Sequence, residues 1–129
     1  MNSIEQMRWA KTLLEEKSGG AFELVAGNVR GDLFLRCSDT AHVGLYLTMQ
    51  PNTNTGRYDC QFQGYTRISS GYYDASGMQR LADEYRMVAS LIKELDAARI
   101  SLSPEELVAF STELLSTEEQ QTTAPQMGM

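Results

Sequence analysis

Residues 21–37 read AFELVAGNVRGDLFLRC, and this stretch decides how the chain folds. Apolar and polar residues alternate on both sides of the segment NVRG at positions 28–31, which is the period of a half-buried strand. Asn at the start of this segment and Gly at its end favour a type I turn closed by a left-handed glycine bulge. The pattern therefore predicts a β-hairpin in which Leu24 lies opposite Leu35.

The tripeptide Arg30-Gly31-Asp32, which adhesion proteins present to integrins, lies within this turn. The hairpin explains it by backbone geometry, because the same register also places Phe22 opposite Cys37 on the core face. An integrin ligand would be extracellular, whereas the N-terminal residues carry charges where a signal peptide needs an apolar run. We therefore interpret the tripeptide as a turn and not as an adhesion signal.

The alternating pattern continues to Ile68 and predicts four strands, over residues 21–27, 32–38, 42–50 and 57–68. Every second residue in these strands is apolar, which places the apolar residues on one face of a sheet. We expect that face to be the core. Its expected members in the last three strands are Leu33, Leu35, Cys37, Val43, Leu45, Leu47, Met49, Tyr58, Cys60 and Phe62.

Helical patterns lie on both sides of the strands. The segment SIEQ at residues 3–6 fits a capping box and opens an amphipathic helix over residues 4–18, which the glycines at 19–20 end. The segment SPEE at residues 103–106 combines an N-cap, a proline at the first helical position and a capping-box glutamate. These signals predict a first and a last helix.

The strongest periodicity in the chain predicts a helix that Asp74 or Ser76 caps. Its apolar stripe could lie across the sheet or pair with another helix. The last helix is also apolar, so it must be buried on its own domain or on a partner. The stripe consists of Met78, Leu81, Tyr85, Val88, Ile92 and Leu95, with Ala82 and Ala89 beside it, and the last helix carries Leu107, Val108, Phe110, Leu114 and Leu115.

The predicted architecture is α+β, with an N-terminal helix, a four-stranded antiparallel meander sheet, and two C-terminal helices packed on one sheet face. Residues 1–116 form a single domain. Residues 117–129 are rich in Thr, Gln, Glu and Met, and we expect them to be a disordered tail because they cannot bury enough apolar surface.

Composition argues against several function classes. The net charge is −6, and Lys and Arg are not clustered as counterion-driven binding of nucleic acid requires. No apolar run reaches the roughly 20 residues that span a bilayer, so we expect no membrane role and a cytoplasmic location.

Cys37 and Cys60 show no CxxC spacing, and strand parity places Cys37 and His42, the single histidine, on opposite faces of the sheet. We therefore expect no catalytic residues, no metal site and no cofactor.

Tyrosines and clustered acids are the features that favour protein binding. Parity places Tyr46 opposite the core, with Tyr65 nearby if a bulge at Gly64 shifts the phase; Gly44 and Gly64 could also mark close backbone approach. Residues 103–119 hold five acids and no base, which suits a partner with a basic surface or simply solvates a helix. The expected partner-binding residues are Tyr46, Tyr65, Tyr72, Tyr73, Glu105, Glu106, Phe110 and Glu113.

The sequence favours a non-enzymatic protein-protein interaction module, such as an adaptor, a chaperone or an inhibitor. In size and acidity the chain is similar to secretion chaperones and to phage-encoded inhibitors of host defence, although no motif supports either. The alternative is a small-molecule-binding domain or minor enzyme with a pocket between the sheet and the second helix. Its polar groups would be Tyr58, Arg67, Tyr72, Tyr73 and Asp74. A homodimer built by the heptad stripe and the third helix is compatible with both.

Overall fold

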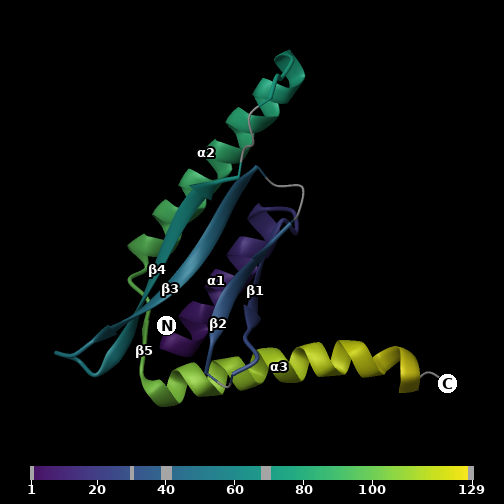
Figure 1. The fold of residues 1–129 in the computed structure, drawn as a ribbon. Helices are drawn as coiled ribbons and strands as arrows, with labels where there is room; N and C mark the ends of the chain where they lie inside the picture. The colour runs from purple at the N-terminus through teal and green to yellow at the C-terminus, as the bar shows by residue number, and fades with distance from the viewer. Residues whose placement is uncertain (1, 30, 39–41, 68–70, 128–129) are drawn as a thin grey trace.

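The computed structural model of the chain is an α+β fold, with three helices and five strands among the residues it describes. It describes residues 2–29, 31–38, 42–67 and 71–127, with side chains described as far as residue 116. Figure 1 shows the strands running alongside α1 and α2, with α3 crossing one end of the molecule. The elements are α1 (Ser3–Lys17), β1 (Phe22–Ala26), β2 (Leu33–Cys37), β3 (Val43–Asn52), β4 (Arg57–Thr66), α2 (Ala75–Ala97), β5 (Ser101–Leu102) and α3 (Pro104–Met127).

The β1–β2 hairpin has the predicted register. Leu24 lies opposite Leu35 and Phe22 lies opposite Cys37. Gly31 has a φ of 98°, the left-handed conformation expected of it. The turn hydrogen bond joins the Asp32 N–H to the Val29 carbonyl at 3.0 Å, one residue later than predicted. Arg30 of the adhesion-like tripeptide lies outside the described residues.

The β3–β4 hairpin corrects the expectation of a bulge at Gly64. The antiparallel ladder runs without interruption from Asn52 opposite Arg57 to Val43 opposite Thr66. Tyr65 shares a face with Tyr46 through simple alternation, so the predicted phase shift was wrong. The sequence reading also missed the two-residue strand β5, which pairs with the start of β4.

The strands form two sheets, in the orders β1-β2 and β3-β4-β5, where the sequence predicted one continuous meander of four strands. Between β2 and β3 no hydrogen-bonded ladder forms within the described residues. The two strands still contact each other, and the Cys37 thiol donates to the Leu45 carbonyl at 3.1 Å. The sheet is therefore split along one line.

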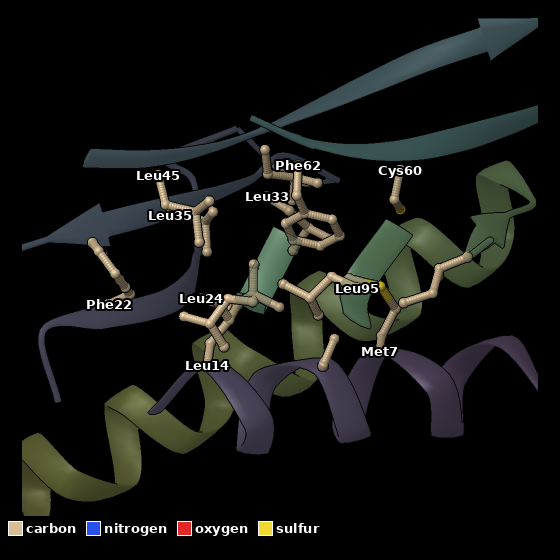
Figure 2. Close-up of a cluster of buried hydrophobic side chains, with 14 of the residues drawn as sticks. Met7, Leu14, Phe22, Leu24, Leu33, Leu35, Leu45, Cys60, Phe62 and Leu95 are labelled. Atoms are coloured by element: carbon tan, nitrogen blue, oxygen red, sulfur yellow. The ribbon is translucent and has the colours of Figure 1, made fainter. Parts of the chain in front are cut away.

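The core lies on one side of the strands, which we call the inner face. Figure 2 shows strand side chains such as Leu45 and Phe62 directed toward Met7 and Leu14 of α1. From α2, Leu81, Val88, Leu91 and Leu95 are buried, so α1 and α2 together cover the inner face. The buried strand residues of the core cluster are Phe22, Leu24, Ala26, Leu33, Leu35, Val43, Leu45, Leu47, Cys60, Phe62 and Leu102.

The helix beginnings follow from their capping residues, with one correction. Asn2, not Ser3, caps α1, because its side chain accepts the Glu5 N–H at 2.9 Å. Asp74 caps α2 by accepting the Gly77 N–H at 2.8 Å.

The capping box of α3 has the predicted form. Glu106 accepts the Ser103 N–H at 2.8 Å, and the Ser103 hydroxyl accepts the Glu106 N–H at 3.1 Å.

The third helix packs on its own domain. Phe110, Ser111 and Leu114 are buried, and α3 contacts β1 and α1. The Ser111 hydroxyl accepts the Gly31 N–H and donates to the Asp32 carbonyl, each at 3.3 Å, which fastens α3 to the β1–β2 turn. The helix continues to Met127, further than the sequence suggested, and the disordered tail over residues 117–129 stays a prediction.

Candidate functional site

The strand face opposite the core, which we call the outer face, carries exposed aromatic side chains. By alternation this face includes Phe34, Tyr46, Gln50, Gln61, Gln63 and Tyr65, together with the charged residues Glu23, Arg36 and Asp59. Phe34 is 44% exposed and the two tyrosines are each 41% exposed. No described helix covers these aromatic rings. These three aromatic side chains are therefore partly open to solvent, whereas Val25, opposite Phe34 on the same face, is buried.

Tyr46 and Tyr65 lie together on the outer face, toward the end of the ladder where Val43 pairs with Thr66. Their ring centroids lie 5.9 Å apart with the planes tilted by 59°. The Tyr46 hydroxyl donates to the side-chain oxygen of Gln63, its cross-strand neighbour. These contacts hold both rings in fixed positions, which lowers the entropy that a partner would have to remove on binding.

Tyr65 is held by a glycine in the neighbouring strand. A Cβ atom on Gly44 would lie 2.2 Å from Tyr65 Cζ, so only glycine leaves room for the ring to lie flat on β3. Partial burial raises the pKa of Tyr65, and the adjacent Cys37 thiol raises this pKa further through its charge and a hydrogen bond. Close approach of the ring thus explains Gly44, and a Cβ atom on Gly64 would lie 3.1 Å from Val88 Cγ1, a less severe contact.

The loop before α2 carries the other two tyrosines. Tyr72 is fully exposed and Tyr73 is 37% exposed. The Tyr73 ring meets the His42 ring edge-on at 6.1 Å, and His42 Nδ1 lies 2.7 Å from Glu84 Oε2. Glu84 Oε1 also accepts the His42 N–H at 2.7 Å.

His42 and Glu84 form a clasp between β3 and α2. Burial alone would raise the pKa of Glu84, but hydrogen bonds from the His42 ring and from the backbone N–H groups of His42 and Val43 outweigh burial and lower this pKa. His42 therefore has a carboxylate partner, and Cys37 bonds elsewhere, to Leu45. The structure does not bring the cysteine and the histidine together as a dyad.

The acids of α3 are engaged within the chain to a degree that the sequence did not reveal. Arg57 Nη2 lies 2.8 Å from Glu106, and the Ser103 N–H followed by Arg57 lowers the pKa of Glu106. Arg8 donates to both carboxylate oxygens of Glu113 and lowers the pKa of Glu113. Glu105 is exposed.

Phe110 requires a correction, because it is 1% exposed and belongs to the core. Its side chain cannot meet a partner while the domain is folded.

The predicted partner-binding residues do not form one surface. Tyr46 and Tyr65 lie together on the outer face, whereas Tyr72 and Tyr73 precede α2. Figure 1 places the start of α2 and the helix α3 at opposite ends of the molecule, so the acids of α3 lie far from the loop tyrosines. The outer face is where predicted residues from two different strands meet.

A depression does lie between the sheet and α2, but its lining differs from the predicted one. A depression of about 510 Å³ lies beside β4 and the end of α2, lined mainly by residues 59–63 with Asp96, Arg99 and Ile100. None of the predicted polar groups lines it. A larger cleft of about 790 Å³ separates the β1–β2 turn from the end of the β3–β4 hairpin, and its apolar lining includes Phe34, Met49 and Leu107.

Sequence reasoning missed Glu84 and Arg57, whose side chains each make several hydrogen bonds to distant parts of the chain. Arg57 donates to Ser3, to Ser101 and to Glu106, which ties β4 to α1, β5 and α3. Both residues act on partners more than 40 positions away. No local spacing marks such contacts.

Within the described residues, no group of three or more His, Cys, Asp or Glu side chains could hold a metal ion. Across the same residues, no helix has the length and apolar character needed to cross a bilayer. Comparison with protein-family models, with curated proteins and with solved structures finds no match for this chain.

Proposed function

We propose that this chain is a non-enzymatic protein-interaction module that binds a partner protein through the outer face. The observation that carries the proposal is the pair of half-exposed tyrosines, Tyr46 and Tyr65, on a strand face that no described helix covers. Tyrosine supplies a large apolar contact and a hydroxyl with few rotatable bonds, which suits the centre of an interface. Such a module acts as an adaptor, a chaperone or an inhibitor by occupying its partner's surface.

The chemistry of the outer face suggests what the partner offers. Phe34 extends the apolar area beyond the tyrosine pair, and Gln61 and Gln63 add neutral hydrogen-bonding groups between the rings. Since Glu106 and Glu113 are already paired with arginines, attraction to a basic partner contributes less than the sequence suggested. The partner should therefore present an apolar patch with polar edges. Free Cys37 and Cys60 fit the reducing cytoplasm as its setting.

The experiment compares matched tyrosine variants of the full chain. Proteins retained from the source cells are identified by mass spectrometry, and the Kd of the purified partner is then measured by calorimetry. Tyr46→Ser should weaken binding by roughly tenfold or more, because central aromatic residues contribute most of the affinity. Tyr72→Ser removes an equally large but fully exposed ring and should leave the Kd unchanged.

Two results would overturn the proposal. If Tyr46→Ser and wild type bind every retained protein equally, the outer face is not the binding surface. If Tyr72→Ser alone abolishes binding, the loop before α2 replaces the outer face. Removing residues 103–129 is a poor test, because that segment supplies Phe110 and Leu114 to the core.

The cleft between the hairpins supports a second candidate, a small apolar ligand. Its volume of about 790 Å³ matches that of ligand sites, and Met49, Leu107 and Val108 line it. A ligand that raises the Tm of wild type but not of Val108→Trp, in which the larger ring fills the cleft, would favour this function. A library of metabolites that shifts neither Tm would remove it.

A further inference from the structure

The far edge of β4 is unpaired over its second half. The Arg67 N–H donates to the His42 carbonyl, so alternation turns the N–H and C=O groups of even-numbered β4 residues away from β3. On that edge β5 pairs with Tyr58, the Cys60 N–H donates to Ile100, and the Phe62 N–H donates to Asp96. No described residue pairs with the edge beyond that point.

This edge lacks the usual protection against pairing. Residues 61–66 read QFQGYT, without a charge or a proline, and the ladder to β3 contains no bulge. Gly64 is exposed, so another backbone can approach it closely. An unguarded edge of this kind is a template for a further strand.

An apolar seam on α2 runs beside the same edge. Met78, Ala82, Tyr85 and Ala89 recur at alternating steps of four and three and are exposed, with Met78 at 56% and Tyr85 at 42%. Ile92, half-buried, continues the seam.

Two contacts show which way this seam points. A Cβ atom on Gly64 would lie 3.3 Å from Ile92 Cδ1. Asp96, the next residue in the row, accepts the Phe62 N–H at 3.2 Å. The seam and the open edge therefore form one continuous surface.

We propose that two copies of this chain associate about a two-fold axis close to Gly64, with their β4 edges paired antiparallel and their α2 seams in contact. Each Gly64 exchanges both backbone hydrogen bonds with Gly64 of the second copy. The Thr66 N–H of each copy donates to the Phe62 carbonyl of the other, and Asp96 keeps the Phe62 N–H. Ala89, next to the axis, is small enough for the two helices to pack closely.

A second copy fits this surface better than an unrelated strand does. A lone strand would pair with the edge and leave Tyr85, Ala89 and Ile92 of the seam without a partner. A two-fold axis supplies an edge and an antiparallel seam together, as an isologous interface requires. It also brings Arg86, which flanks the seam, to the level of Asp96 in the other copy, so that opposite charges meet. The outer face stays free, so this association is independent of partner binding there.

Sedimentation equilibrium of the full chain over a wide range of concentrations tests the proposal. Wild type should move from 14.4 kDa toward twice that mass as concentration rises. Ala89→Arg places a charge in the centre of the seam and should stay at 14.4 kDa. Ser90→Arg makes the same change on the solvent side of α2, at an exposed position, and should dimerise as wild type does. Far-UV circular dichroism should be the same for all three.

Amide hydrogen exchange locates the interface. Exchange at Gly64 and Thr66 should slow with rising concentration in wild type and in Ser90→Arg, but not in Ala89→Arg. A wild-type mass of 14.4 kDa at every concentration would exclude the dimer. Equal dimerisation of both arginine variants, or dimerisation without slower exchange at Gly64, would place the contact elsewhere and overturn the proposal.

Discussion

Gly44 determines where the Tyr65 ring lies, because any Cβ at this position would overlap three ring carbons at 2.2 to 2.6 Å. Gly44→Ala should therefore displace the ring and lower the free energy of unfolding by about 1–2 kcal/mol, the cost of an overpacked contact. Urea unfolding measures this loss. Without the steric conflict Gly44→Ala should instead raise the free energy of unfolding, since alanine restricts the unfolded chain more than glycine does.

A double-mutant cycle isolates that conflict. In a Tyr65→Ser background the space above Gly44 is empty, so Gly44→Ala should become neutral or stabilising there. The same change at Gly71, where a Cβ would meet nothing within 4 Å, gives the control. A loss of the same size in both backgrounds would mean that the ring does not occupy the position described.

Ser111 is a second residue whose removal has a defined cost. Its hydroxyl is fully buried and bonds to the backbone of both Gly31 and Asp32. Ser111→Ala would leave the Gly31 N–H without its partner and would remove one of the two hydrogen bonds that the Asp32 carbonyl accepts, the other coming from the Gly27 N–H. We therefore expect a loss of about 1–3 kcal/mol in guanidinium unfolding. Ser116→Ala, exposed on the same helix, should change stability little. Equal stabilities of the two variants would show that α3 is not fastened at this turn.

At the scale of the elements, the His42–Glu84 clasp between β3 and α2 should make the free energy of unfolding depend on pH in the acid range. The pKa of Glu84 is lowered below the 4.5 of an ordinary glutamate, so near and below this pH the unfolded state binds more protons than the folded state. The clasp's contribution is complete above pH 4.5 and is lost as the pH falls through the lowered pKa. The pKa values of Glu106 and Glu113 are lowered in the same direction.

Glu84→Gln tests the clasp. It should lower the free energy of unfolding by about 1–2 kcal/mol at neutral pH, since a charged acceptor is lost, and should flatten the fall in stability below pH 4.5. Glu94→Gln, at an exposed position of the same helix, should keep the wild-type slope. Parallel slopes for wild type and Glu84→Gln would refute the clasp.

The elements themselves could be read from the sequence wherever the signal was local. The alternation on both sides of residues 28–31 gave the correct register of β1 against β2, and the segment at residues 103–106 capped α3 as predicted. The prediction that Ser3 caps α1 was wrong because the neighbouring Asn2 is an equally good capping residue, and the sequence does not distinguish the two. At Gly64 strand parity alone was sufficient, and the added bulge was unnecessary.

At the scale of the whole molecule, the features that the sequence could not predict depend on contacts between distant residues. Partners far along the chain decide whether α3 packs on its own domain and whether the sheet is continuous. They also decide what Arg57 and Glu84 bind. Tyr46 could be placed on the outer face from parity, since alternation is local. Phe110 could not be recognised as a core residue, because the sequence of an apolar helix is the same whether the helix packs on its own domain or on a partner.

Truncation tests how the whole domain is assembled. A chain that ends at Leu102 loses buried Phe110 and Leu114, each worth several kcal/mol, out of a total stability of about 5–15 kcal/mol. It should show no cooperative thermal transition by circular dichroism. A chain that ends at Ser116 retains these residues and should melt as the full chain does. Cooperative melting of the shorter chain would show that α3 is not part of the domain.

The break between β2 and β3 also affects how the molecule deforms. Backbone hydrogen bonds make each hairpin stiff, whereas across the break the described residues are joined by side-chain packing and the Cys37 contact. A bending load therefore concentrates on this one line. Phe34 lies on one side of it and Tyr46 on the other, so the outer face can change its curvature without disturbing either hairpin. We therefore expect the proposed partner-binding face to adapt to partners of different shape.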